Sequence, residues 1–401
     1  MVSRIMITAA IALASSQAFA QEPSWTAEAA VSNALSSPGI ERMLDGELRA
    51  AVATVEAATV VPVPRLGVSR AEVFGDTNVG TVEYAVTVEQ ELDVSGWRGR
   101  LRGSLPHREA AIRAAHDVRR QEIAEAVQTA FYGVRYRQER VLAMDLWIAR
   151  IAQGLESVRA RQGRGDVSLY DVDRVRRELE IVGGQRAVER SRLAEAWATL
   201  ETWTTAPRRP TLVGELAPTT PGRRGDAPLP DLVRLQALDG ALAAEIDALG
   251  APVLRGWTLG AGYRHVTVGP SVGQGFELTL TVPLALWSTD EASVDRLRAE
   301  QTEIGGELEL SRARSEQAER AAARRLEEAL DALSGLPDAG RDAELTQLAE
   351  ASFAAGESTL TELLDAYRSE VELQLSRIDL QWEARRASIE LNRRRGTGVA
   401  P

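Results

Sequence analysis

The chain contains the stretch GDVSLYDV at residues 165–172 and a related stretch, GESTLTEL, at residues 356–363, which is 191 residues further on. A second related pair lies upstream, with YAVTVEQEL at residues 84–92 and FELTLTVPL at residues 276–284, 192 residues apart. A nearly constant displacement indicates that one ancestral unit is present twice. Each unit is predicted to hold a strand pair followed by a long helical hairpin.

The domain organisation follows from this duplication. In the first repeat, residues 21–203, short helices precede strands at about 64–74 and 80–92, and the helical hairpin covers about 98–203. In the second repeat, residues 229–395, strands are expected at about 253–268 and 275–287, and the hairpin at about 290–395. Residues 204–228 carry five prolines and are predicted to form an irregular linker, the equatorial region. Residues 396–401 are expected to be a flexible tail.

The expected strands alternate between apolar and polar residues, which predicts a sheet with one apolar and one polar face. The polar set is Glu83, Thr87, Glu89, Glu277, Thr279 and Thr281. Two interpretations stay open: membrane-barrel strands with lipid on the apolar side and water on the polar side, or an ordinary sheet with one solvated face. Bacterial barrels begin at about eight strands, so four per chain do not close one, whereas three chains supply about twelve.

The helices are predicted to be unusually long and to pack as coiled coils. From about residue 98 to 162 no convincing break follows Pro106, which is tolerated in a first turn. An apolar seam with 3.5-residue spacing predicts coiled-coil packing and is interrupted by Arg137. Its members are Ile123, Val127, Ala130, Val134, Val141, Met144, Ile148, Ile151, Leu155 and Val158. In the second repeat, Gly335-Leu336-Pro337 predicts a kink or break.

Composition excludes several classes of function. The 401 residues include 47 basic side chains, all of them Arg, against 58 acidic ones, for a net charge of −11, which argues against nucleic-acid binding. There is no Cys, hence no disulfide, thiolate metal site or acylated Cys. Gly269-Pro270-Ser271-Val272-Gly273 fits a nucleophile elbow, but a strand is expected after it where the motif needs a helix, so an external loop is predicted. We expect no enzyme activity, catalytic residue, metal site or cofactor.

The first twenty residues have the layout of a secretory signal peptide. Arg4 precedes a mostly apolar run from Ile5 to Ala14, and Ala18-Phe19-Ala20 forms an A-x-A cleavage site. A short buried helix is the alternative. No later stretch approaches eighteen consecutive apolar residues, so no transmembrane helix is expected.

The mature chain resembles the TolC-like outer-membrane efflux proteins, and most of all their CzcC-type cation-efflux branch. The resemblance rests on GESTLTELLDA at 356–366, Arg385-Arg386-Ala387, residues 391–396, and the strand exits EQEL at 89–92 and VPL at 282–284. It implies a homotrimer with a twelve-stranded barrel in outer-membrane lipid and an α-helical tunnel in the periplasm of a Gram-negative cell. It also implies two partners, a periplasmic adaptor (membrane fusion) protein and an inner-membrane pump of the resistance-nodulation-division type.

The implied function is the exit channel of a tripartite efflux system, with heavy-metal cations as the expected cargo. Organic toxins or drugs are the alternative cargo. A soluble periplasmic coiled-coil scaffold is the alternative of a different class.

The resemblance places candidate sites at the two helix turns. Adaptor-docking tips are expected at Gly165, Asp166, Val167, Ser168 and Leu169, and at Gly356, Glu357, Ser358, Thr359 and Leu360. Glu362, Asp365 and Asp171 are expected to form an acidic ring at the periplasmic aperture. Simpler roles stay open: the glycines permit the turns, Ser168 and Thr359 cap helices, and the acids offset helix dipoles.

One departure from the family concerns closure of the aperture. Some relatives hold it shut with a Tyr and an Arg that bridge to an acid on the first hairpin. The positions aligned with them are Phe353 and Ser358, facing Asp171. Neither side chain suits such a polar lock, so closure is expected to rest on other groups or to be looser.

Overall fold

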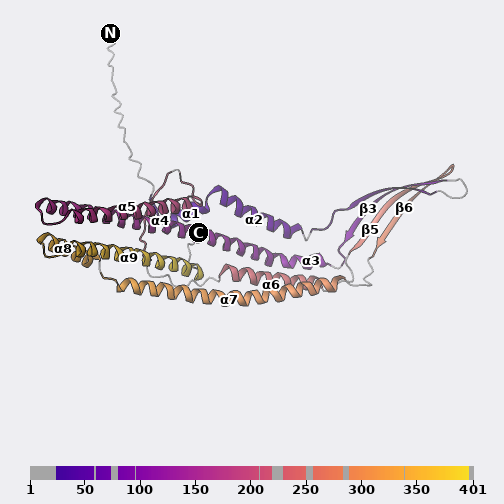
Figure 1. Cartoon of the computed structure of the whole chain (residues 1–401). Coiled ribbons are helices and arrows are strands. Elements are labelled where there is room, and N and C mark those ends of the chain that lie inside the picture. Colours follow the sequence, from indigo (N-terminus) through magenta and orange to yellow (C-terminus); the bar gives the residue numbers. More distant parts are fainter. Residues whose placement is uncertain are drawn as a thin grey trace, which may run out of the picture.

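A computed structural model describes residues 24–57, 60–73, 80–94, 96–206, 208–218, 229–249, 256–282, 289–337 and 339–396. The predicted signal peptide, the hairpin turn at 75–78, residues 219–228 of the linker, the strand exit beyond residue 282 and the end of the tail lie outside these residues. The described chain is a long helical body with a small sheet at one end (Figure 1).

Long helices form the body, as the repeat predicted. The first hairpin pairs α4 (Leu105–Arg164) with α5 (Leu169–Glu201). The 60 residues of α4 correspond to about 90 Å at the usual rise per residue. The second hairpin pairs α7 (Thr289–Gly335) and α8 (Ala339–Ala355) with α9 (Leu360–Arg394). The outgoing helix breaks after Gly335, where Gly335-Leu336-Pro337 predicted a break, because Pro337 lacks the N–H that a continuous helix needs.

Shorter helices surround these hairpins. They are α1 (Ala27–Leu35), α2 (Pro38–Ala57), α3 (Trp97–Leu101) and α6 (Pro230–Leu249). A 3-10 turn, Arg102–Ser104, connects α3 to α4, so the helix expected from residue 98 is divided near its start. In both repeats a helix precedes the strand pair, which is the order of elements that the duplication predicted.

The sheet contains four antiparallel strands in the order β2-β3-β5-β6. Its members are β2 (Arg65–Val73), β3 (Thr81–Leu92), β5 (Trp257–Val268) and β6 (Ser271–Thr281). The two repeats therefore meet at β3 and β5, where Thr81 pairs with Val268 and Leu92 with Trp257. The sheet is open in the described chain, with β2 and β6 at its edges.

Two expectations about loops were wrong. The segment from Gly269 to Gly275 was expected to be a loop, but β6 begins at Ser271 and the turn is Gly269-Pro270, with Gly269 at a φ of 54°. The glycines of this strand are in regular register with β5, and Gly273 pairs with Val266. The linker is not wholly irregular either, since β4 (Thr211–Leu212) pairs in parallel with β1 (Ser24–Trp25).

The apolar core is divided along the length of the body. One cluster joins α1, α4 and α5 around Val127, Phe131 and Leu200, at the equator of the molecule. A second joins α4, α5, α8 and α9 around Ile151, Val175 and Leu364, near the hairpin turns. No helix in the described part of the chain is long and apolar enough to cross a membrane.

Candidate functional site

The turn of the first hairpin is built by local sequence signals. Gly165 ends α4 with a φ of 89°, a left-handed conformation that favours glycine. Ser168 then caps α5: its hydroxyl accepts the Asp171 backbone N–H at 3.2 Å, and the Asp171 carboxylate accepts the Ser168 N–H at 3.0 Å. This reciprocal pair is a capping box, which satisfies two free backbone donors.

The turn of the second hairpin repeats this chemistry. Gly356 follows α8 with a φ of 80°, and Thr359 and Glu362 form the capping box of α9. The backbone N–H of Thr359 donates to the Glu362 carboxylate at 2.7 Å. These backbone and hydroxyl hydrogen bonds lower the pKa of Glu362 from its usual value. Asp171 and Glu362 thus complete the capping boxes of α5 and α9, together with Ser168 and Thr359, for which helix capping was the simpler role left open.

The two turns nevertheless differ in what they expose. On the first turn, Leu169 is 65% exposed and Tyr170 is 74% exposed. The matching residue on the second turn, Leu360, is 7% exposed because it packs into the core near the turns. Asp365 lies one turn beyond Glu362 and is exposed, with its carboxylate 3.7 Å from Arg368. Both tips were expected to be docking surfaces, and of the two turns the first carries the exposed side chains of Leu169 and Tyr170.

Four polar contacts join the two hairpins just inside these turns. The Arg368 guanidinium donates to both carboxylate oxygens of Glu178 on α5, at 3.0 and 2.6 Å. Arg174 on α5 donates to the Thr361 hydroxyl at 2.8 Å. Arg161 on α4 donates to the backbone carbonyl of Phe353, and Arg150 on α4 donates to Glu370. These bonds connect residues about 190 to 220 positions apart in the chain.

A buried Tyr lies beside this network and makes its polar contact within the second hairpin. Tyr367 is buried, and its hydroxyl donates to Glu350 on α8 at 2.9 Å. Burial, and then the hydrogen bond to Glu350, raises the pKa of Tyr367 well above its usual value. Phe353 is also buried, and the Arg161 guanidinium lies 4.7 Å from its ring centre. The Tyr and the Arg of α9 near this turn therefore differ: Tyr367 contacts Glu350 within the second hairpin, whereas Arg368 contacts Glu178 on the first hairpin.

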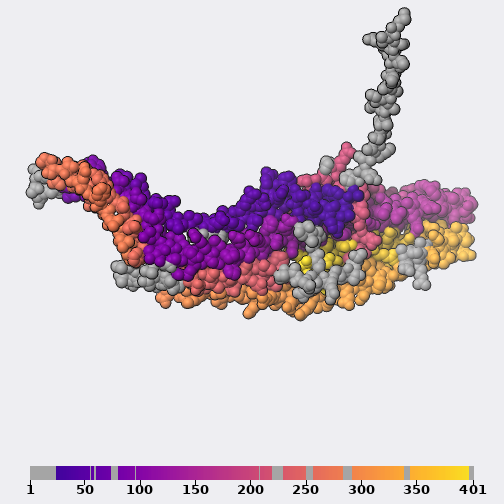
Figure 2. Space-filling model, turned by 180° about the vertical axis from the view of Figure 1, so that it is seen from behind, coloured from indigo at the N-terminus to yellow at the C-terminus, as the bar shows by residue number. Residues whose placement is uncertain are grey.

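The sheet separates its side chains as the alternation predicted. The register of the strands puts Glu83, Thr87, Glu89, Glu277, Thr279 and Thr281 on one face. The opposite face is apolar and exposed, and Phe276 is 93% and Leu278 78% accessible. Its other large members are Leu66, Val68, Tyr84, Val86, Val88, Leu259, Tyr263 and Leu280. Figure 2 shows the sheet as a bent arm that extends beyond the helical body.

On the polar face of the sheet, side chains around Thr87 have little free space. Thr87 lies between Gly67 on β2 and Gly262 on β5. A Cβ added at Gly67 would be 2.7 Å from the Thr87 hydroxyl, and one at Gly262 would be 2.8 Å from its methyl group. Small residues on one face let a sheet curl toward that face, so the polar face is suited to be the concave side.

Charges on the polar face are partly neutralised. Arg264 on β5 lies between two acids, with its guanidinium 3.0 Å from Glu83 on β3 and 2.6 Å from Glu277 on β6. The alternation pattern had identified the acids but missed this Arg, because the pairing of β3 with β5 is not visible in local sequence. The three charges together leave this row with one net negative charge per chain.

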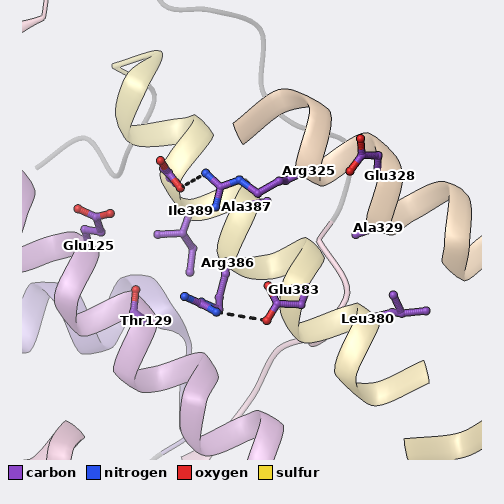
Figure 3. A pocket seen from close by; sticks show the side chains of 11 residues that line it. Glu125, Thr129, Arg325, Glu328, Ala329, Leu380, Glu383, Arg386, Ala387 and Ile389 are labelled. Atoms are coloured by element: carbon purple, nitrogen blue, oxygen red, sulfur yellow. Dashed lines mark hydrogen bonds and ion pairs between the residues drawn. The ribbon is translucent and has the colours of Figure 1, made fainter. Parts of the chain in front are cut away.

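The helical body also carries a cavity that is lined by charged residues. A cavity of about 470 Å³ lies between α4, α7 and α9, lined by Glu125, Arg325, Glu383 and Arg386 among others. Figure 3 shows Arg386 reaching Glu383, whereas the side chain of Glu125 stands apart on the other side of the cavity. Within the described residues, no group of three or more His, Cys, Asp or Glu side chains is arranged to hold a metal ion.

Comparison with solved structures shows the fold. The chain aligns with CusC, described for folding and transmembrane channel formation, at a TM-score of 0.75 and 16% identity, over 92% of this chain and 91% of CusC. It aligns with the CmeC outer membrane channel of Campylobacter jejuni at a TM-score of 0.71 and 13% identity, over 93% of this chain and 86% of CmeC. It aligns with the open state of the MtrE outer membrane channel of Neisseria gonorrhoeae at a TM-score of 0.70 and 17% identity, over 93% of this chain and 89% of MtrE. No family model matches the sequence, and no curated protein matches it either.

Proposed function

We propose that this chain is one protomer of a trimeric outer-membrane exit channel in a tripartite efflux system, and that it does no bond chemistry. The observation that carries the proposal is the sheet, whose apolar face is exposed and whose edges, β2 and β6, have no neighbouring strand in the described chain. A water-soluble protein rarely leaves so large an apolar face uncovered. The same face suits contact with lipid.

Closure of a barrel from three copies accounts for both features. Each free edge carries unpaired backbone groups that need partners in lipid, and a β2 edge of one copy is free to pair with a β6 edge of the next. Three sheets of four strands give about twelve strands, an even number within the bacterial range. The crowded polar face around Thr87 then lines the water-filled interior, and Phe276 and Leu278 contact acyl chains.

Aromatic residues are spaced along the sheet as a membrane would require. Tyr263 and Phe276 form an edge-to-face pair with ring centres 5.8 Å apart, about halfway along β5 and β6; beyond them the same face carries the polar residues His265 and Arg70. Trp257 begins β5 at the end nearest the helical body. The six steps along the strand from Trp257 to Tyr263 span about 20 Å at the usual rise per residue. Aromatic rows flanking an apolar band of this height are typical of outer-membrane barrels.

The helical hairpins form the periplasmic part of the proposed duct. Three copies of the two hairpins enclose a tunnel that ends at the turns around Gly165 and Gly356. The exposed Leu169 and Tyr170 are the residues of these turns best suited to dock an adaptor protein, because apolar contacts gain most from losing water. The pump of the resistance-nodulation-division type delivers cargo through that adaptor.

The proposed cargo is a divalent heavy-metal cation, in keeping with the CzcC-like sequence features. A net charge of −11 and the acids on the polar face of the sheet favour cations in a water-filled passage. Asp365 is exposed beside the second turn and is the best placed acid for a ring at the aperture, with Glu362 behind it. Organic compounds are the competing cargo, which transport assays with the cognate pump distinguish.

Membrane fractionation tests the proposal directly. We expect the native chain in the outer-membrane fraction as a trimer that runs more slowly in denaturing gels before heating than the monomer that heating releases. Glu replacing both Phe276 and Leu278 should abolish membrane insertion, since a charge on the lipid face costs several kcal/mol in total. Glu replacing Leu345 and Leu348, exposed on the helix α8, is the control for added charge alone. A soluble periplasmic monomer would support the scaffold alternative and reject the channel.

A further inference from the structure

The helical body contains a layer of charged residues between its two apolar cores. Along α4, the equatorial core ends at Val134 and the core near the turns begins at Met144. Between these residues, Arg137 interrupts the apolar seam and donates to Glu189 on α5 at 3.0 Å. Glu189 is 3% exposed and also receives a hydrogen bond from Arg192 at 2.7 Å. Between Val134 and Met144, ion pairs therefore take the place of apolar coiled-coil packing.

The same layer extends to α9. Arg140 lies 3.4 Å from Glu189 and donates to Asp379 on α9 at 2.5 Å. Tyr136 donates to the same Asp379 oxygen at 2.8 Å, and its ring stacks on Trp382. We name Tyr136, Arg137, Arg140, Glu189 and Asp379 the charged layer. A small apolar cluster, Ala143, Leu216 and Ile378, lies beside it.

One helix is interrupted at the height of the charged layer, and another is weakened beside the layer, on the side of the hairpin turns. The break between α7 and α8 lies there, because Arg377, two residues before Asp379, donates to the Pro337 carbonyl. On α5, Gly183 and Gly184 precede Glu189 by about one and a half turns. A Cβ added at either glycine meets no atom within 4 Å, so packing does not require glycine there. Two adjacent glycines weaken a helix and are a recognised cause of bending.

We infer that the charged layer is a hinge, about which the hairpin ends of residues 144–182 and 339–375 move as a unit relative to the equatorial body. Apolar coiled-coil packing resists bending because its side chains interlock, whereas ion pairs between long Arg side chains adjust over small displacements. The break after Gly335 and the glycine pair remove two of the helices that would otherwise resist this motion. The α4 helix runs through the hinge unbroken and keeps the two parts connected.

Native-state hydrogen exchange on the purified full chain tests the hinge without any substitution. We expect amides of residues 135–143 and 183–192 to exchange about tenfold faster than those of 123–134 and 144–158, since local opening is easiest where apolar contacts are fewest. Exchange in the layer that is as slow as in both flanking segments overturns the inference. The measurement is independent of membrane insertion, so its failure and that of the proposed channel are distinguishable.

A pair of matched variants tests the role of the glycines. Gly183→Ala with Gly184→Ala should slow exchange in the layer about tenfold, because each alanine favours the helix and meets open space. Gly305→Ala with Gly306→Ala is the control, since this glycine pair lies in the interior of α7, away from the layer, and also has open space around it. Equal slowing of the layer by both variants overturns the hinge.

Motion itself is measured with spin labels, which the Cys-free sequence makes specific. One labelled pair, Glu180 on α5 and Glu372 on α9, lies between the charged layer and the hairpin turns. A second pair, Glu180 and Glu195, lies along α5 on opposite sides of the charged layer. With labelled protomers diluted by unlabelled ones, we expect a broad distribution of distances between Glu180 and Glu195 and a narrow distribution between Glu180 and Glu372. The Gly183→Ala, Gly184→Ala variant should narrow the distribution between Glu180 and Glu195. A distribution between Glu180 and Glu195 that is already as narrow as that between Glu180 and Glu372 overturns the proposal.

Discussion

Arg368 on α9 binds both carboxylate oxygens of Glu178 on α5, with Nε–Oε1 at 3.0 Å and Nη2–Oε2 at 2.6 Å. Glu178 is buried, whereas the Arg368 side chain is 42% exposed. The hydrogen bonds to Glu178 raise the pKa of Arg368, so the guanidinium stays charged throughout the physiological range. Bidentate pairs between Arg and a carboxylate are among the stronger hydrogen bonds in proteins, and this one joins the two hairpins near their turns.

Breaking this pair should loosen the end of the proposed channel. Glu178→Gln keeps the shape of the side chain but removes its charge, and we expect a loss of about 1–2 kcal/mol in stability, moderated by the exposure of Arg368. In planar bilayers the variant should open more often or conduct more than the native protein. Glu180→Gln, at an exposed position on the same helix, is the matched control and should behave like the native chain. Equal conductance of Glu178→Gln and the native protein would contradict a closing role.

Local features of the fold were predictable because their causes lie within a few residues. Gly165 followed by Ser168 and Asp171 predicts a turn and a capped helix from chemistry that spans one helical turn. The alternation around Val86 and Leu278 likewise identified both faces of the sheet, since side-chain direction reverses at each residue of a strand. The break at Gly335 and Pro337 followed from backbone chemistry alone.

Contacts between distant segments were not predictable in this way. The pairing of Arg368 with Glu178 joins residues 190 positions apart, and nothing in either local sequence distinguishes them from solvated charges. Arg264 was missed for the same reason, because its two acids lie on neighbouring strands. The strand from Ser271 was mistaken for a loop because glycines there mimic turn chemistry, although its register with β5 is regular.

Charge at the second turn should influence ion selectivity without disturbing the fold. Glu362→Gln with Asp365→Asn removes both negative charges, and Gln retains the ability to complete a capping box with Thr359. We expect reduced preference for cations in reversal-potential measurements. Thermal unfolding serves as the control and should change little at neutral pH. Unchanged selectivity would eliminate the acidic ring.

The capping role of Glu362 makes a separate prediction for acid solution. Its pKa is lower in the folded chain than in the unfolded one, so its contribution to stability is present above the unfolded value and is lost as pH falls through the folded value. Glu362→Gln should therefore weaken the acid dependence of hydrogen exchange in the first turn of α9. Exchange in the first turn of α5, which Asp171 caps, provides the internal control.

Neutralising Arg264 should affect the proposed barrel interior. Arg264→Gln leaves Glu83 and Glu277 without their shared cation, so three chains would gain three negative charges in a ring. We expect stronger cation selectivity than in the native channel, with the opposite result for Glu277→Gln. Arg70→Gln is a control on the other face of the same sheet. Identical selectivity in all three variants would show that this row does not face the permeation path.

Tyr367 should make stability sensitive to alkaline solution. Burial raises its pKa above the unfolded value of about 10, so its contribution to stability is complete below that value and declines as pH rises past it, by at most about 1.4 kcal/mol per pH unit. Tyr367→Phe loses the hydrogen bond to Glu350 and should cost about 1 kcal/mol at pH 7. Because Phe has no proton to lose, the difference between the two proteins should shrink between pH 10 and 11, as measured by denaturant unfolding. A difference that is constant over this range would show that Tyr367 ionises as readily in the folded chain as in the unfolded one.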